Sequence, residues 1–260
     1  MTDSLETNWI SHAAAFNVTL SAVQQNQFER YAELLAAGNT RTNLTRIVEP
    51  QAIRIRHFLD SLTVAILPIW NPTDRSLVDV GTGAGFPGLA LAIAYPALQV
   101  TLIDSVRRKA DFLQRVVEEL SLENVRVLAM RAEDAGRAEE LRERFDFAVA
   151  RSVARLPTLL EYLLPLVRID GAAIVWKGAT AARECADSEF ALRELGVDAD
   201  PVADGTSETN NVHDPVSVQL PGVDSEHFLV TFSKVRSTPQ KYPRRAGQPS
   251  KRPLLRPRVR

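Results

Sequence analysis

A glycine-rich segment between Asp79 and Gly88 has the residue types and spacing to bind a nucleotide-like ligand. Glycines adopt positive φ freely and let the backbone come close to a ligand, and the start of a helix offers free N–H groups. Two patterns overlap here. Gly81, Gly83 and Gly85 match the GxGxG of methyltransferases, whereas Gly83, Gly85 and Gly88 match the GxGxxG dinucleotide fingerprint. The glycines alone therefore leave S-adenosylmethionine and NAD equally open.

Two carboxylates accompany this segment. Asp104 lies nineteen residues after Gly85, at the end of the next predicted strand, where it could accept hydrogen bonds from the ribose hydroxyls of either cofactor. Asp79 precedes the first glycine. A carboxylate suits the methionine amino group of S-adenosylmethionine there but would repel a pyrophosphate. The alternative is that Asp79 only caps N–H groups of the loop.

Further candidate residues follow three later predicted strands. Ala132 and Glu133 could meet the edge of an adenine, or form an ordinary acidic helix start. Arg151 could pair with the methionine carboxylate or with guanine O6, or form a structural ion pair. Lys177 could meet a phosphate or be a solvated lysine. If the strands are parallel, all these positions lie at one edge of the sheet.

An alternation of strands and helices from residue 76 onward would position these side chains. Apolar strands are predicted at 76–80, 98–103, 125–130, 145–150 and 172–176. An antiparallel hairpin follows at 216–220 and 227–235, with Pro221 and Gly222 in its turn. The pattern predicts an α/β fold with a doubly wound, Rossmann-like sheet that is mostly parallel and ends in the hairpin.

The first 72 residues are predicted to be a helical extension. Ser21 and Gln24 form a possible capping box, and Gly38 could close the helix that they begin. Its buried face is predicted at Phe28, Tyr31 and Leu35. A second helix should begin near Pro50 and end before Pro68. His57 on this helix could serve in helix packing or capping, or could stack on or bond to RNA.

Charge is distributed unevenly along the 260 residues. The net charge is −1, yet residues 236–260 contain no Asp or Glu. They contain nine basic residues: Arg236, Lys241, Arg244, Arg245, Lys251, Arg252, Arg256, Arg258 and Arg260. Such a segment suits a phosphate backbone, or is a disordered solubilising terminus. The sequence thus divides into a helical extension (1–72), a cofactor-binding domain (73–235) and a basic tail (236–260).

Cysteine and histidine usage argue against other chemistry. Cys185 is the only cysteine, which excludes an internal disulfide and fits a reducing compartment. The four histidines are scattered, so no metal site is expected. With no signal peptide or apolar span in the sequence, we expect a cytoplasmic protein that does not contact a membrane.

Short segments across nearly the whole chain match a known family. They lie at 43–45, 56–62, 79–88, 102–105, 109, 112–113, 131–133, 151, 177–178, 242–245, 247, 249 and 251–254. In these segments the chain resembles the small-subunit ribosomal RNA guanine-N7 methyltransferases, also called the glucose-inhibited division protein B family. The run from Arg56 to Leu62 and the tail from Pro243 to Pro249 are far more specific than the glycines. Two segments depart from the family: Ala150-Arg151-Ser152 stands for Ser-Arg-Ala, and Gly38-Asn39 for Trp-Asn.

The resemblance implies a class I methyltransferase sheet and transfer of a methyl group from S-adenosylmethionine to N7 of guanine 527, in the 530 loop of 16S rRNA. The partner would be 16S rRNA or the small ribosomal subunit, and we expect a monomer. With the motifs above, it places cofactor contacts at Asp79, Gly81, Gly83, Gly85, Phe86, Asp104, Ala132, Glu133 and Arg151. RNA contacts are expected at Lys177, Arg244, Arg245, Lys251 and Arg252.

Such a reaction needs no general base, because guanine N7 carries a free lone pair at neutral pH. Positioning and fixed dipoles would be sufficient, and Arg151 is the best candidate near the target base. The alternatives are a small-molecule methyltransferase, an NAD(P) oxidoreductase, or a non-catalytic ribosome-assembly factor on the same fold.

Overall fold

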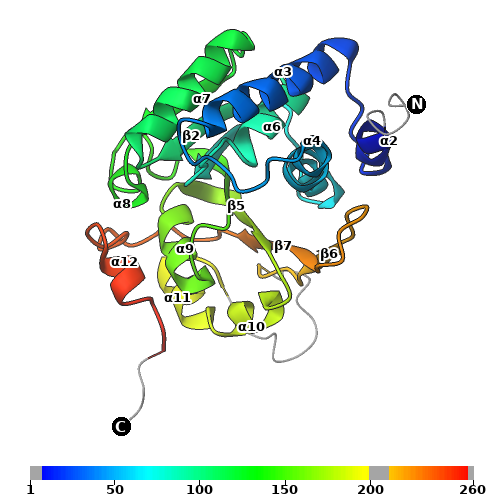
Figure 1. Ribbon diagram of the computed structural model, residues 1–260. Helices are drawn as coiled ribbons and strands as arrows, with labels where there is room; N and C mark the ends of the chain where they lie inside the picture. The colour runs from blue at the N-terminus through cyan, green and yellow to red at the C-terminus, as the bar shows by residue number, and fades with distance from the viewer. Residues whose placement is uncertain (1–7, 199–210, 257–260) are drawn as a thin grey trace. The chain divides into compact units, whose positions relative to one another are not determined.

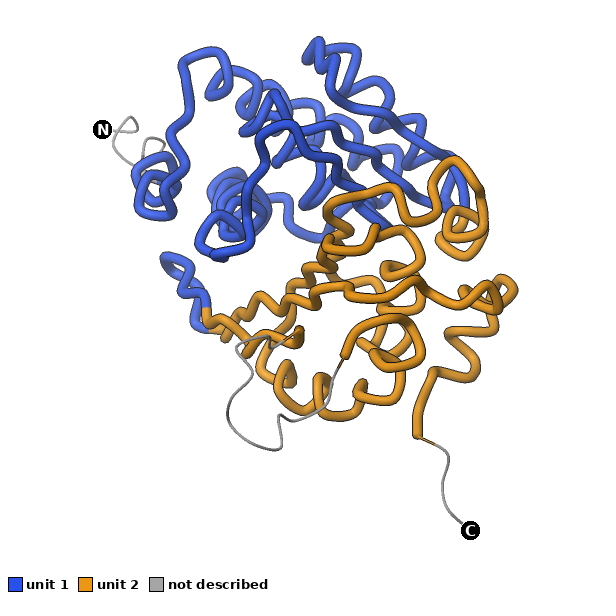
Figure 2. The backbone as a smooth tube through the Cα atoms, turned by 180° about the vertical axis from the view of Figure 1, so that it is seen from behind, with its two compact units in different colours: residues 1–130, 218–224 blue, residues 131–217, 225–260 orange. Residues whose placement is uncertain are grey.

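The computed structural model describes residues 8–198 and 211–256. The chain forms two compact units (Figure 2). Unit 1 contains residues 1–130 and 218–224, and unit 2 contains residues 131–217 and 225–260. These units do not follow the three segments expected from the sequence, whose boundaries stay predictions. No helix in the described part of the chain is long and apolar enough to cross a membrane.

Two helices open unit 1, α2 (Asn8–Ala15) and α3 (Ala22–Asn39). The predicted capping box is confirmed, because Ser21 and Gln24 each accept a hydrogen bond from the other's backbone N–H. The predicted buried face of α3 is confirmed as well. The expectation that Gly38 closes α3 was wrong. Gly38 lies inside the helix, where a Cβ would come within 2.6 Å of the Phe112 ring, so close packing requires the glycine.

The second helical segment begins at Pro50, as predicted, but it is not one regular helix. Its parts are α4 (Pro50–Ile53), the π-helix η1 (Arg54–Leu59), α5 (Asp60–Leu62) and the 3₁₀-helix η2 (Thr63–Ile66). The side chain of Glu49 caps the first turn by accepting hydrogen bonds from the N–H groups of Gln51 and Ala52. A π turn is rare in proteins overall, and those that occur often lie at functional sites. His57 lies within η1, so it is a candidate for a functional role.

The sheet of unit 1 is parallel. Strand β2 (Gln99–Asp104) pairs with β1 (Ser76–Val80) on one side and with β3 (Val125–Ala129) on the other. The connecting helices are α6 (Gly88–Ala94), which is wholly buried, and α7 (Arg107–Glu119). Figure 1 shows α7 running alongside α3. The register pairs Val80 with Ile103, so the loop after β1 starts beside the end of β2.

In unit 2, β4 (Phe145–Arg151) pairs in parallel with β5 (Val167–Lys177), and β7 (His227–Ser233) pairs antiparallel with β5. Strand β6 (Val216–Val218) is the neighbour of β7. The helices are α8 (Ala132–Ala135), α9 (Leu156–Leu163), α10 (Ala181–Ala186), α11 (Glu189–Leu195) and α12 (Gln248–Lys251). Parallel strands alternating with helices, followed by antiparallel strands, confirm the expected fold class.

Strand β5 is longer than the sequence indicates. It starts at Val167 rather than at residue 172. The extra residues include Arg168 and Asp170, which has φ 63°, and the pairing with β4 shifts register between Phe145 and Phe147. A bulged strand start in which charged residues and a glycine interrupt the apolar pattern resembles a turn in the sequence, which explains the error.

Candidate functional site

The loop after β1, residues 81–87, is called the glycine loop here. The N–H groups of Gly81 and Thr82 donate to the carbonyl of Ile103, at 2.8 and 3.1 Å, and so attach the loop to the end of β2. Gly81, Gly83 and Gly85 have φ values of 70°, 62° and 108°. Side chains rarely tolerate this region, so the backbone path itself requires glycine.

The glycines differ in what surrounds them. A Cβ on Gly85 would collide with the hydroxyl of Tyr31, and one on Gly88 would lie 2.5 Å from Leu102. These two positions are therefore glycine for internal packing. A Cβ on Gly83 would meet nothing closer than the Gly81 carbonyl oxygen, 3.9 Å away. Gly83 thus has an open side, with room beside its Cα.

Asp79 holds the glycine loop to helix α6. Its side chain is fully buried, and its Oδ2 accepts hydrogen bonds from the Thr82 hydroxyl (2.7 Å) and the Gly88 N–H (2.8 Å). This geometry matches the alternative considered from the sequence, in which Asp79 caps N–H groups of the loop. A contact of Asp79 with a methionine amino group stays a prediction.

Asp104 ends β2 beside the glycine loop. Its Oδ2 accepts from the Gly83 N–H at 3.0 Å, and its Oδ1 accepts from the Val106 N–H at 2.8 Å. A carboxylate has about four acceptor positions, so two remain for hydroxyl donors. The structure therefore brings together Asp104, Gly81 and Gly83, three of the residues expected to hold the cofactor.

Phe86 joins the glycine loop to the N-terminal helices. The His57 ring stacks on it, with centroids 4.4 Å apart and planes 11° apart, and the His57 Nε2 lies 2.9 Å from the Thr45 hydroxyl. Tyr31 also stacks on Phe86, with ring centroids 5.2 Å apart, and its hydroxyl donates to the Ala84 carbonyl at 2.6 Å. Packing of His57 is confirmed. Its partner Phe86 was missed, although both lie in segments that carry the family resemblance.

Glu133, at the start of α8 in unit 2, has a partner that the sequence did not reveal. Its side chain is buried, and its Oε1 accepts from the Gly247 N–H at 2.8 Å. Gly247 has φ 79°, which favours glycine at this position. Glu133 and Ala132 thus lie where the C-terminal segment is attached, and their cofactor contacts stay predictions.

Arg151 and Lys177 end neighbouring strands. Arg151 pairs in register with Trp176, the residue before Lys177. The Lys177 Nζ lies 2.8 Å from Glu184 Oε2 and 3.2 Å from the Ala154 carbonyl oxygen. With 10% of its side chain exposed, Lys177 is not the solvated lysine considered as an alternative. Burial works to raise the pKa of Glu184, but hydrogen bonds from Lys177 and Thr180 hold that pKa below its usual value.

The C-terminal segment, residues 236–256, packs against the rest of unit 2, which corrects the alternative of a disordered tail for these residues. Arg244 pairs with the fully buried Glu161 at 2.6 Å, and this hydrogen-bonded partner raises the pKa of the guanidinium. Arg244 also donates to the Arg252 carbonyl. The guanidinium predicted to contact RNA is thus engaged inside the protein. Arg258 and Arg260 lie outside the described residues.

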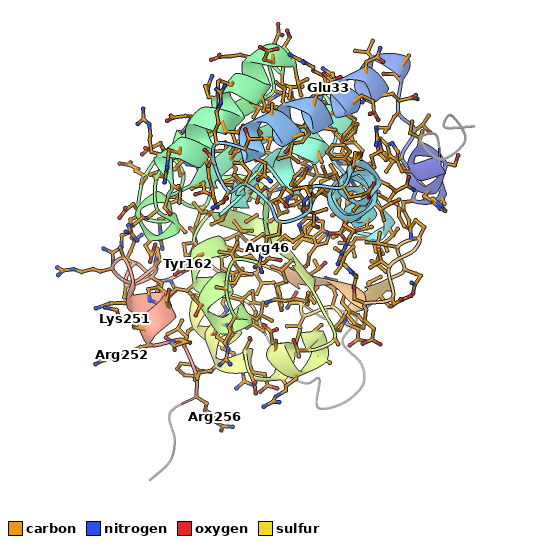
Figure 3. All side chains as sticks on the ribbon, in the orientation of Figure 1. Glu33, Arg46, Tyr162, Lys251, Arg252 and Arg256 are labelled. Carbon is orange, nitrogen blue, oxygen red and sulfur yellow. The ribbon has the colours of Figure 1, made fainter. Side chains whose placement is uncertain are left out.

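Other cations of this segment are on the surface. Arg245, Lys251, Arg252 and Arg256 are exposed. Figure 3 shows Lys251, Arg252 and Arg256 with side chains directed away from the ribbon. Their RNA contacts stay predictions. In the ranges 8–198 and 211–256, no group of three His, Cys, Asp or Glu side chains is placed to hold a metal ion.

A glycine loop after the first strand, with a carboxylate at the end of the second, defines a nucleotide-cofactor-binding α/β protein. Comparison with known proteins narrows this class. The family described as rRNA small subunit methyltransferase G (GidB) matches residues 24–211. The chain belongs to this family.

Relatives match along nearly their whole length. The chain is 41% identical to a ribosomal RNA small subunit methyltransferase G of Leuconostoc mesenteroides over 95% of this chain and 98% of that one. It is 39% identical to the protein of the same name in Acetivibrio thermocellus, over 94% and 95%. Among solved structures, a SAM-dependent methyltransferase from Aquifex aeolicus is 16% identical, with a TM-score of 0.49 over 71% of this chain and 94% of that one.

Proposed function

We propose that the protein transfers a methyl group from S-adenosylmethionine to N7 of guanine 527 in the 530 loop of 16S rRNA, in the cytoplasm. The family carries the substrate class. One observation supports the proposed cofactor: Asp104 Oδ2 accepts a hydrogen bond from the Gly83 N–H at 3.0 Å, next to the open side of Gly83. A ligand with ribose hydroxyls finds there both space and free acceptor positions.

Cofactor residues in unit 1 are proposed at Asp79, Gly81, Gly83, Gly85, Phe86 and Asp104. Among these, Gly83 and Asp104 would contact the ligand, whereas Asp79 and Gly85 support the loop through the contacts described above. When bound, S-adenosylmethionine supplies an activated methyl group. Ala132, Glu133 and Arg151, in unit 2, are proposed as further contacts on the family resemblance alone.

The side chains of this protein would act by binding and orienting rather than by moving protons. Guanine N7 needs no deprotonation, so alignment and exclusion of water can supply the rate. Arg151 is proposed to face the target base. Arg245, Lys251 and Arg252 are proposed to contact phosphates of 16S rRNA or the small subunit. Arg244 is proposed to hold the segment that carries them in place through its ion pair with Glu161.

The test is methyl transfer from labelled S-adenosylmethionine to 16S rRNA and to small subunits, with the product mapped by chemical cleavage at N7-methylguanine. We expect a single modified site at position 527. The variant Asp104→Ala should lose cofactor binding by tenfold or more, because two backbone N–H groups and the ligand lose their acceptor. Cofactor binding without any rRNA methylation would instead favour an assembly factor or a small-molecule enzyme.

A further inference from the structure

The segment between β4 and α9 has a conformation that needs outside support. Residues 152–155, called the β4–α9 loop here, directly follow Arg151, and Ser152 has φ 59°. A non-glycine residue in this region is strained and persists only where the surroundings hold it. Val153 is exposed at the tip of the loop. This loop begins at the residue next to Arg151, the last residue of β4, so its support bears on how Arg151 is presented.

One partly buried ion pair, Lys177–Glu184, supplies the support. The Lys177 Nζ donates to the Ala154 carbonyl, inside the loop, and to Glu184 Oε2. The same Glu184 oxygen accepts from the Leu156 N–H at 3.0 Å, where the loop ends and α9 begins. Lys177 and Glu184 thus fix the middle and the end of the loop.

The pair is itself fixed. Glu184 Oε1 accepts from the Thr180 hydroxyl at 2.9 Å, and Glu184 lies on α10. The side chains of Lys177 and Glu184 are 10% and 24% exposed. Ala154 and Glu184 engage two of the three donors of Lys177, so at most one N–H remains for any other acceptor.

We propose that Lys177 and Glu184 are positioning residues, which hold the β4–α9 loop so that Arg151 is presented to the target base, and that Lys177 does not bind RNA phosphate. This inference rests on the proposed function, in which Arg151 faces the base. It replaces the phosphate contact expected for Lys177 from the sequence.

The two assignments for Lys177 make opposite predictions for Glu184→Gln. A positioning pair loses its geometry when either partner changes, so Lys177→Met and Glu184→Gln should both lower kcat, by about tenfold or more. The KM for rRNA and its salt dependence should change little. If Lys177 bound phosphate, Glu184→Gln would release the ammonium and tighten rRNA binding, while Lys177→Met would reduce the salt slope by about 0.7.

The measurement is kcat and KM for 16S rRNA at several salt concentrations, with kcat expressed per cofactor site titrated by calorimetry. Glu189→Gln, an exposed carboxylate on the neighbouring helix α11, is the matched control and should behave as wild type. Lys251→Met is the reference for loss of a phosphate contact. Lys177→Arg should restore most of kcat, because arginine can still donate to both partners, whereas a purely packing role would not discriminate Arg from Met.

A Glu184→Gln protein with wild-type kcat, or with tighter rRNA binding, overturns the proposal. If Lys177→Met does not fold, Glu184→Gln and Lys177→Arg still decide it. The kcat of the double variant Lys177→Met/Glu184→Gln should be no lower than that of the worse single variant, because either change alone already breaks the same ion pair. Failure of the proposed function is distinguishable, because the wild-type protein would then not methylate rRNA.

Discussion

At the residue scale, two glycines of the glycine loop have different roles, one proposed in ligand binding and one in packing. Gly83 and Gly85 both have positive φ, but only Gly83 faces open space. The sequence predicted the pattern of glycines and could not separate these roles. The separation depends on Tyr31, Leu89 and Leu113, which only the folded chain brings to Gly85.

We predict that Gly85→Ala and Gly83→Ala have different effects. The Cβ of Gly85→Ala meets three side chains, so the free energy of unfolding should fall by about 2–3 kcal/mol. Gly83→Ala should cost about 1 kcal/mol through its φ alone, but should weaken cofactor binding at least tenfold. Urea unfolding and calorimetry with S-adenosylhomocysteine measure the two quantities. Equal stability loss with unchanged binding by Gly83→Ala would contradict this assignment.

At the element scale, apolar patterns predicted most strands and the capped start of α3, whereas tertiary contacts determined the rest. The polar start of β5 at Arg168 and the π turn that contains His57 have no local sequence signal. The partners of Lys177 and Arg244 are carboxylates elsewhere in the chain, and sequence alone does not pair distant residues. The C-terminal segment is the main example: its charge left open a phosphate-binding tail or a disordered terminus, whereas residues 236–256 pack against the rest of unit 2.

We predict that Arg244→Met destabilises the protein and that surface changes in the same segment do not. Arg244→Met leaves the fully buried Glu161 carboxylate without its cation, which should cost about 3 kcal/mol of unfolding free energy. The matched control is Arg245→Met, an exposed neighbour, for which we expect a change within about 0.5 kcal/mol. Urea denaturation compares them. Equal losses for both variants would show that Glu161 does not depend on Arg244.

The exposed cations carry a separate prediction. The double variant Lys251→Gln/Arg252→Gln should keep wild-type stability and cofactor affinity but weaken rRNA binding. If both residues contact phosphate, the slope of log K against log salt should become shallower by about 1.4. Binding isotherms at several salt concentrations test this, and an unchanged slope would remove these residues from the RNA interface.

At the scale of the whole molecule, a fully buried lysine contributes to the free energy of unfolding. The side chain of Lys234 is 0% exposed, and its Nζ donates to Glu143 Oε1 and to the carbonyls of Leu164 and Val167, at 2.7, 2.8 and 2.7 Å. Burial lowers the pKa of Lys234 to about 8, against the opposing effect of Glu143. Lys234→Met should cost about 3–5 kcal/mol of unfolding free energy, because it removes the cation that pairs with Glu143 and one donor to each of two carbonyls.

The acid side of the stability profile should report on Glu143. Burial works to raise the pKa of Glu143, but Lys234 and the Thr238 N–H together hold it below its ordinary 4.5. The stability from this carboxylate is therefore complete above pH 4.5 and is lost as the pH falls through the lowered pKa. We expect the stability gap between wild type and Glu143→Gln, measured by urea unfolding from pH 7 to pH 3, to narrow in that range. A gap independent of pH would contradict the assignment.

Attachment of the last described residues to Glu161 and Glu133 has a consequence for shortened chains. A stop codon placed after Val235 would strip two buried acids of their donors. The product would be exposed to unfolding and proteolysis rather than being an enzyme with reduced affinity for its substrate. In a cell, loss of this segment should therefore lower the amount of folded protein.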